Sequence, residues 1–162
     1  MTDPRHLLLV GTGPGLGAAI ARRFAREGYR LTLVARSEAT IAQELRAAGA
    51  DVAVVQADAG DPGRLRAALS SLFAGPGAPG VVIYNAALMT FDELLTVSPE
   101  QLADAYAVDV IGGVLTAQLA VPAMREAGGG TLLFTGGGFA DALPASLART
   151  VAATSFQGAA HE

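Results

Sequence analysis

The chain has 162 residues, a length that suits one domain with a single sizeable core. Its hydrophobic fraction is 51%, its charged fraction is 16% and its net charge is -4, which together exclude a disordered chain and argue against a nucleic-acid partner. It has no cysteine, and its two histidines, His6 and His161, lie near opposite ends of the chain, so we expect neither disulfides nor a metal site.

Five short apolar runs predict the strands of a parallel sheet. Each run is nearly continuous and rich in leucine or β-branched residues, as expected of strands that are covered on both faces. The runs lie at residues 7–10, 31–35, 52–57, 81–84 and 131–134.

Helical segments alternate with these runs, at residues 16–27, 38–48, 62–73 and 99–127. The sequence SPEQ at 98–101 predicts a capping box at the start of the last helix, and GPGAPG at 75–80 predicts a loop. The alternation favours an α/β fold, a Rossmann-like doubly wound parallel sheet of about five strands in the order 3-2-1-4-5. No linker divides residues 1–162, so we expect one domain, with 139–162 irregular or a remnant helix.

The stretch VGTGPGLG at residues 10–17 follows the first predicted strand and opens the first predicted helix. Gly13-x-Gly15-x-x-Ala18 satisfies the alanine variant of the dinucleotide fingerprint, whereas Gly11-x-x-x-Gly15-x-Gly17 has a different spacing. In either register, glycines allow a sharp turn and a close approach of phosphate to the helix N-terminus. The stretch therefore predicts a phosphate cradle. The alternative is an ordinary tight turn.

The Gly11-x-x-x-Gly15-x-Gly17 spacing resembles the cofactor loop of the short-chain dehydrogenase/reductase family. In the same order along the chain, Asp58 is similar to the acidic residue that contacts adenine, and Asn85 matches the second asparagine of the family's Asn-Asn-Ala-Gly motif. The resemblance covers residues 6 to about 140. It implies an NAD(P)-dependent oxidoreductase that transfers hydride between nicotinamide and a small carbonyl or alcohol substrate. It also implies homo-oligomers that associate through the long helix at 99–127.

The second predicted strand is followed by Arg36 and Ser37, where an NAD site typically has a carboxylate. Arginine and a hydroxyl instead suit the 2'-phosphate of NADP, so we favour NADP, with NAD possible. A solvated Arg36, with Glu38 turning in to the ribose, is the alternative. The candidate cofactor contacts are Gly11, Thr12, Gly15, Leu16, Gly17, Arg36, Asp58 and Asn85.

The catalytic residues of the family have no clear counterpart. The family carries a serine after the fifth strand, a Tyr-x-x-x-Lys pair and an asparagine in the long helix. Here glycines occupy 136–137, Thr135 is the nearest hydroxyl, Asp109 stands at the asparagine position, and all eleven basic residues are arginines. We therefore leave the catalytic residues unassigned, with Thr135 and Asp109 as candidates. Asp109 could transfer a proton with a raised pKa or bond the backbone in a structural role.

Two functions stay open at this point. One is an active oxidoreductase, and the other is a non-catalytic NAD(P)-binding sensor or partner protein that has lost the catalytic groups. The sequence ends early for the family, which we interpret as a truncated member. No apolar stretch near the N-terminus is long enough for a signal peptide, so we expect a cytoplasmic protein without a membrane partner.

Overall fold

The fold is taken from a computed structural model that describes residues 3–38, 40–75, 77–89 and 95–136. Five parallel strands form one sheet in the order β3-β2-β1-β4-β5, which confirms the predicted topology. The strands are β1 (Asp3–Val10), β2 (Arg30–Ala35), β3 (Val52–Gln56), β4 (Pro79–Tyr84) and β5 (Thr131–Phe134).

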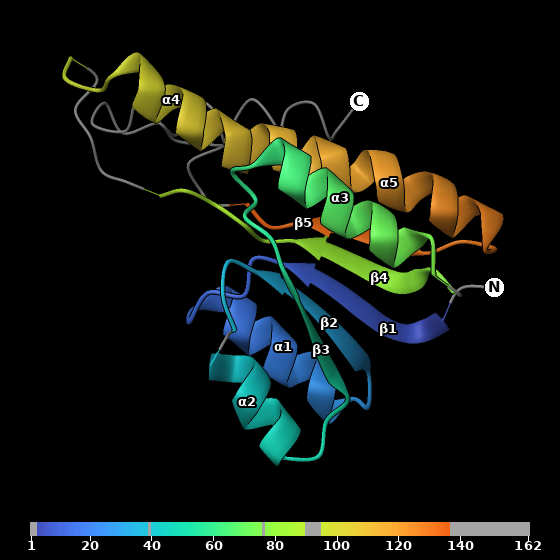
Figure 1. The fold of residues 1–162 in the computed structure, drawn as a ribbon. Coiled ribbons are helices and arrows are strands. Elements are labelled where there is room, and N and C mark those ends of the chain that lie inside the picture. The colour runs from blue at the N-terminus through green and yellow to red at the C-terminus, as the bar shows by residue number, and fades with distance from the viewer. Residues whose placement is uncertain (1–2, 39, 76, 90–94, 137–162) are drawn as a thin grey trace.

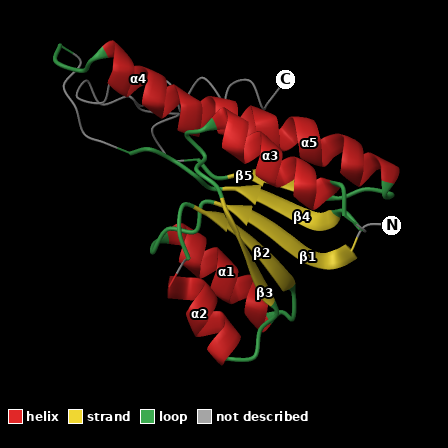
Figure 2. Ribbon diagram, in the orientation of Figure 1, coloured by secondary structure: helices red, strands yellow, loops and turns green. Residues whose placement is uncertain are grey.

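Helices cover both faces of this sheet (Figures 1 and 2). Helices α1 (Leu16–Arg26) and α2 (Thr40–Ala47) lie on one face. On the other face, α3 (Pro62–Phe73) packs beside a long helix made of α4 (Pro99–Tyr106), a π-helical segment η1 (Ala107–Ile111) and α5 (Gly112–Glu126).

The run LLLV is apolar throughout because alternate side chains of β1 enter two different cores. Leu7 and Leu9 pack with the buried residues of α1 and α2 on one face. Leu8 and Val10 pack on the other face with residues of α3, including Leu65, which is fully buried. Both halves of the fold are therefore anchored on the strand that leads into the glycine stretch.

The strand register brings the candidate site residues to one edge of the sheet. Val10 pairs with Val34 on one side and with Tyr84 on the other, and Tyr84 pairs with Phe134. The residues that follow these positions therefore meet at the carboxyl edge of the sheet, which is where ligands bind in open α/β folds.

The long helix begins with the predicted capping box: the Ser98 hydroxyl accepts from the Gln101 N–H at 3.2 Å, and the Gln101 side chain accepts from the Ser98 N–H at 2.8 Å. Residues Pro99–Glu126 have the length and mean hydropathy, 1.5, of a possible membrane span. In this structure α5 instead contacts α3, β4 and β5, as a helix that covers the sheet of a layered α/β domain does.

Element boundaries differ from the predictions by two residues or more at three places. The first strand begins at Asp3, and the fourth begins at Pro79, inside the stretch 75–80 that was predicted as a loop. Asp3 pairs with Pro79, so the two strands extend each other beyond their apolar runs. Helix α2 begins at Thr40, two residues later than predicted. The prediction for residues 139–162 lies outside the described residues.

Candidate functional site

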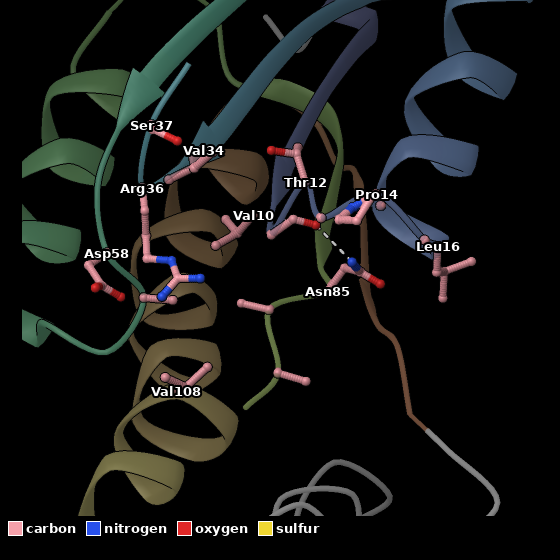
Figure 3. A pocket seen from close by; sticks show the side chains of 18 of the residues that line it. Val10, Thr12, Pro14, Leu16, Val34, Arg36, Ser37, Asp58, Asn85 and Val108 are labelled. Carbon is pink, nitrogen blue, oxygen red and sulfur yellow. Dashed lines mark hydrogen bonds between the residues drawn. The ribbon is translucent and has the colours of Figure 1, made fainter. Parts of the chain in front are cut away.

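A cavity of about 750 Å³ lies at the carboxyl ends of the strands (Figure 3). This volume is within the usual range for small-molecule and cofactor sites. All eight residues that the sequence predicts as cofactor contacts line it: Gly11, Thr12, Gly15, Leu16, Gly17, Arg36, Asp58 and Asn85. In the close view, Arg36 and Asp58 lie at one end of the cavity, whereas Pro14 and Leu16 lie at the other.

Two glycines of the loop are required by packing. Gly11 has a φ of +94°, and a Cβ at this position would collide with the backbone of Ala86. A Cβ on Gly17 would collide with the Gly11 carbonyl oxygen and lie 3.1 Å from Asn85 Nδ2. The start of α1, the end of β1 and the residues after β4 thus meet at distances that only glycine permits.

The other two glycines of the loop face open space. A Cβ on Gly13 or Gly15 would meet no atom within 4 Å. Gly15 is the N-cap of α1, and no side chain caps this helix within the described structure. The Ala18 N–H donates to the Gly13 carbonyl oxygen at 3.0 Å, so it is the N–H groups of Leu16 and Gly17 that remain, with the positive end of the helix dipole, for a ligand at the open side of the loop. This arrangement is the one that binds phosphate at helix N-termini.

Asn85 connects the glycine loop to the two neighbouring strands. Its Nδ2 donates to the Gly11 carbonyl oxygen at 2.7 Å, and its backbone N–H donates to Val10 O at 2.8 Å. The Thr135 hydroxyl donates to Asn85 Oδ1 at 3.0 Å. Thr135 therefore holds the amide of Asn85 in the orientation that binds the loop, and its hydroxyl proton is used in this contact.

At the opposite end of the cavity, the Arg36 side chain extends from the end of β2 (Figure 3). The Arg36 carbonyl oxygen accepts from Gln56 Nε2 at 2.7 Å, which ties the loop after β2 to the end of β3. Asp58 Oδ1 accepts from the Gly60 N–H at 2.9 Å, which fixes the carboxylate at the edge of the cavity. Glu38 pairs with Arg46, so its carboxylate is held by α2 rather than by Arg36.

The Gln56 anchor was missed by sequence reasoning, although a polar residue at the end of an apolar strand is a recognisable signal. The contact pairs a side chain on β3 with a backbone carbonyl on the loop after β2, and it depends on the register in which Ala35 faces Gln56. Sequence spacing alone does not fix that register.

Asp109 and Tyr84 join the cavity to the long helix. Asp109 Oδ1 accepts from the Leu88 N–H at 2.8 Å, which is the structural role weighed for this carboxylate. The Tyr84 hydroxyl donates to the carbonyl oxygen of Val108, in the π-helical segment η1. Burial, then the negative charges of Asp109 and Asp58, raise the pKa of Tyr84 well above its usual range. A tyrosine in this state retains its proton at neutral pH.

The Tyr84 hydroxyl also explains the glycine at position 112 of the long helix. A Cβ on Gly112 would collide with that hydroxyl. The Val108 carbonyl lies in the π-helical turn, and the Tyr84 hydroxyl donates to it. The tyrosine at the end of β4 is therefore joined directly to the distorted part of the long helix.

Thr12 is the buried polar group that stands out in this cavity. The residue is 8% exposed, and its hydroxyl has no hydrogen-bond partner among the described residues. A buried hydroxyl without a partner is costly, and such groups are uncommon in folded proteins. The group lines a cavity in which a ligand could satisfy it.

Comparison with known proteins identifies the class of this α/β domain. A family model described as short chain dehydrogenase matches residues 5–146, and the chain belongs to the short-chain dehydrogenase/reductase family. The matched span includes the glycine loop, the Arg36 loop and both flanking cores, so the resemblance carried by the sequence motifs is confirmed at the level of the family.

Individual relatives give the same result. The chain is 30% identical to versicolorin reductase 1 of Aspergillus parasiticus over 137 residues, which are 82% of this chain and 52% of that protein. It is 34% identical to an uncharacterized oxidoreductase of Mycobacterium tuberculosis, over 81% of this chain and 51% of that protein. The chain thus spans about half the length of these relatives.

A solved structure supports the fold. A metagenomic short-chain oxidoreductase in complex with NADP superposes with a TM-score of 0.89 at 24% identity, and the match covers 98% of this chain and 72% of that chain.

Proposed function

We propose that this chain binds NADP(H) in the cavity at the carboxyl edge of the sheet and acts as an NAD(P)-dependent oxidoreductase. The reaction class is hydride transfer between nicotinamide and a carbonyl or alcohol group of a small molecule. The observation that carries the proposal is the open side of the glycine loop, where Gly13 and Gly15 leave space in front of the uncapped start of α1.

The residues present fit such a cofactor. The N–H groups at the start of α1 suit the pyrophosphate, and the buried, unpartnered Thr12 hydroxyl lies in a residue that lines the same cavity. Asp58 and Arg36 lie at the far end, where the adenosine half would be held. When bound, the nicotinamide would give or take the hydride, while the chain orients it and excludes water.

The preference for NADP over NAD rests on Arg36. Its guanidinium extends into the cavity, and no carboxylate pairs with it within the part of the chain that the structure describes. An arginine in this position can make charge-assisted bonds to a 2'-phosphate. NADPH should therefore bind more tightly than NADH.

A second candidate function is that of a non-catalytic NAD(P)-binding sensor or partner protein. The candidate proton donors favour it, because the Thr135 hydroxyl and the Asp109 carboxylate are both engaged in positioning contacts. Tyr84 is buried with a raised pKa, so it is a poor proton donor to a substrate.

One experiment separates the two functions. Purified protein is titrated with NADPH and with NADH while cofactor fluorescence is followed, and turnover is then measured on simple ketones. Saturable binding with turnover supports the oxidoreductase, and binding without turnover supports the sensor. If the folded protein binds neither dinucleotide, both candidates are wrong.

We also propose that the chain associates with itself through the long helix. Three large apolar side chains on this helix are exposed, at Leu102, Tyr106 and Val114. Exposed apolar side chains that gather on one element favour association. A Leu102→Glu, Val114→Glu variant should sediment as a smaller species than the wild type, and an unchanged sedimentation coefficient would contradict this interface.

A further inference from the structure

Helix α2 holds an ion pair at the rim of the cavity. Arg46, near the end of this helix, places Nη1 2.5 Å from Glu38 Oε1. The same guanidinium donates through Nε to Val52 O at 2.8 Å, so it is anchored on the start of β3. Glu38 itself lines the cavity. Arg46, which does not line the cavity, thus holds the carboxylate of Glu38, which does.

Arg36 and Glu38 belong to the same short loop but carry opposite charges. Arg36 extends into the cavity (Figure 3). The Glu38 carboxylate is instead paired with Arg46. A free carboxylate at this loop would accept hydrogen bonds from ribose hydroxyls, as in NAD sites, and would repel a 2'-phosphate. Whether a ligand meets the positive charge of Arg36 or the negative charge of Glu38 therefore depends on the ion pair between Arg46 and Glu38.

We propose that Arg46 is a positioning residue that sets cofactor specificity. By holding the Glu38 carboxylate, it leaves Arg36 as the charge that faces the ribose end of the ligand. Loss of Arg46 releases Glu38 and shifts the preference from NADPH toward NADH. This inference rests on the proposed function, because it requires the adenosine half of the dinucleotide to lie against Arg36.

The size of the effect follows from the exposure of the pair. The side chains of Arg46 and Glu38 are 41% and 49% exposed, and ion pairs of this kind hold their partners only weakly. We therefore expect Arg46→Met to lower the ratio of the NADH to the NADPH dissociation constant by about two- to fivefold. Arg46→Lys, which keeps the charge without the planar fork, should give an intermediate ratio.

The chain offers a matched control on the same helix. Arg22 on α1 pairs with Glu44 on α2 through two bonds of 2.8 and 2.7 Å, and these side chains are 42% and 50% exposed. Neither residue is among those that line the cavity. Arg22→Met removes an equivalent ion pair from α2, so it should leave the ratio of dissociation constants unchanged.

The test measures dissociation constants for NADPH and NADH in the wild type, Arg46→Met, Glu38→Gln, the double variant and Arg22→Met. Urea unfolding verifies that each variant is folded. We expect a lowered ratio in Arg46→Met and a ratio at or above the wild-type value in Glu38→Gln and in the double variant, because the released Glu38 carboxylate is what lowers the ratio.

Three results would overturn the inference in distinguishable ways. An unchanged ratio in Arg46→Met, with wild-type preference for NADPH, removes the role of Arg46 and leaves the proposed function intact. A ratio lowered equally in Arg46→Met and the double variant assigns the effect to the Val52 contact rather than to Glu38. A wild type that binds neither dinucleotide, or prefers NADH, overturns the proposed cofactor and the inference with it.

Discussion

The glycine loop allows a prediction in which stability and binding respond to different glycines. Gly17→Ala would place a Cβ against the Gly11 carbonyl oxygen, 3.0 Å from the Thr12 Cα and 3.1 Å from Asn85 Nδ2. Gly13→Ala is the matched control, because its Cβ would meet no atom within 4 Å. Both substitutions add the same methyl group to the same loop.

The cost of Gly17→Ala can be worked from these contacts. Overpacking of a tight contact costs about 1–3 kcal/mol, and displacing the Asn85 amide from the Gly11 carbonyl costs about 1 kcal/mol more. The better helix propensity of alanine returns about 1 kcal/mol. The free energy of unfolding should therefore fall by roughly 1–3 kcal/mol, which at an m-value of about 2 kcal/mol/M lowers the urea midpoint by roughly 0.5–1.5 M.

Binding supplies the second half of the prediction. Gly15→Ala would point its Cβ into the open space where the pyrophosphate is proposed to lie, so the NADPH dissociation constant should rise by about tenfold or more. Gly13→Ala, whose Cβ faces the same open space, should also weaken NADPH binding while it leaves the free energy of unfolding unchanged. Urea unfolding and fluorescence titration measure the two effects. Wild-type unfolding of Gly17→Ala, or wild-type NADPH binding in Gly15→Ala, would refute the reasoning.

Three further predictions address the other parts of the fold. Arg36→Met should weaken NADPH binding by about 10- to 100-fold and leave NADH binding unchanged, because hydrogen bonds to charged groups contribute about 1.5–3 kcal/mol; equal losses for both dinucleotides in titrations would contradict this. Tyr84→Phe should lower the free energy of unfolding by about 1–3 kcal/mol, because the carbonyl of Val108 loses its donor; a wild-type urea midpoint would argue against that coupling. Burial, then the charge of Arg30, lower the pKa of His6 below its ordinary 6.5, so the unfolded chain binds the proton more readily. The free energy of unfolding should therefore fall as the pH drops through about 6.5, and it should fall by less in His6→Gln than in the wild type. An equal loss of unfolding free energy between pH 7 and pH 5 in the two proteins, measured by urea unfolding, would contradict this.

The His6 environment shows why the start of β1 was not predicted. His6 is buried, with Nε2 2.8 Å from the Thr32 hydroxyl and Nδ1 3.1 Å from the Arg30 guanidinium, and Arg30 also pairs with Asp3 at 3.1 Å. These polar residues give no apolar signal, yet they satisfy each other across two strands. Such pairing depends on tertiary contacts, which a local pattern does not contain.

The strand order and the helices were predictable because their signals are local. Continuous apolar runs and the Ser98 capping box each lie within a few residues, and right-handed crossovers restrict the topology. The π-helical segment has no such local signal. Its contact with Tyr84 joins residues more than twenty positions apart in the sequence, and these meet only in the folded chain.

The eight residues that motif spacing predicts as cofactor contacts all line one cavity, but spacing does not predict the contacts between them. The roles of the connecting side chains follow from orientation, which spacing does not fix. Thr135 was considered as a proton donor, and the structure directs its hydroxyl to Asn85 instead. Glu38 was considered as a ribose ligand, and the structure pairs it with Arg46.

The most direct test of the central proposal is a crystal structure of the protein grown with NADPH. We expect the pyrophosphate to lie against the start of α1 beside Gly15, and the 2'-phosphate to lie against the Arg36 guanidinium. NADPH bound elsewhere, or bound in the cavity with its 2'-phosphate turned away from Arg36, would contradict it.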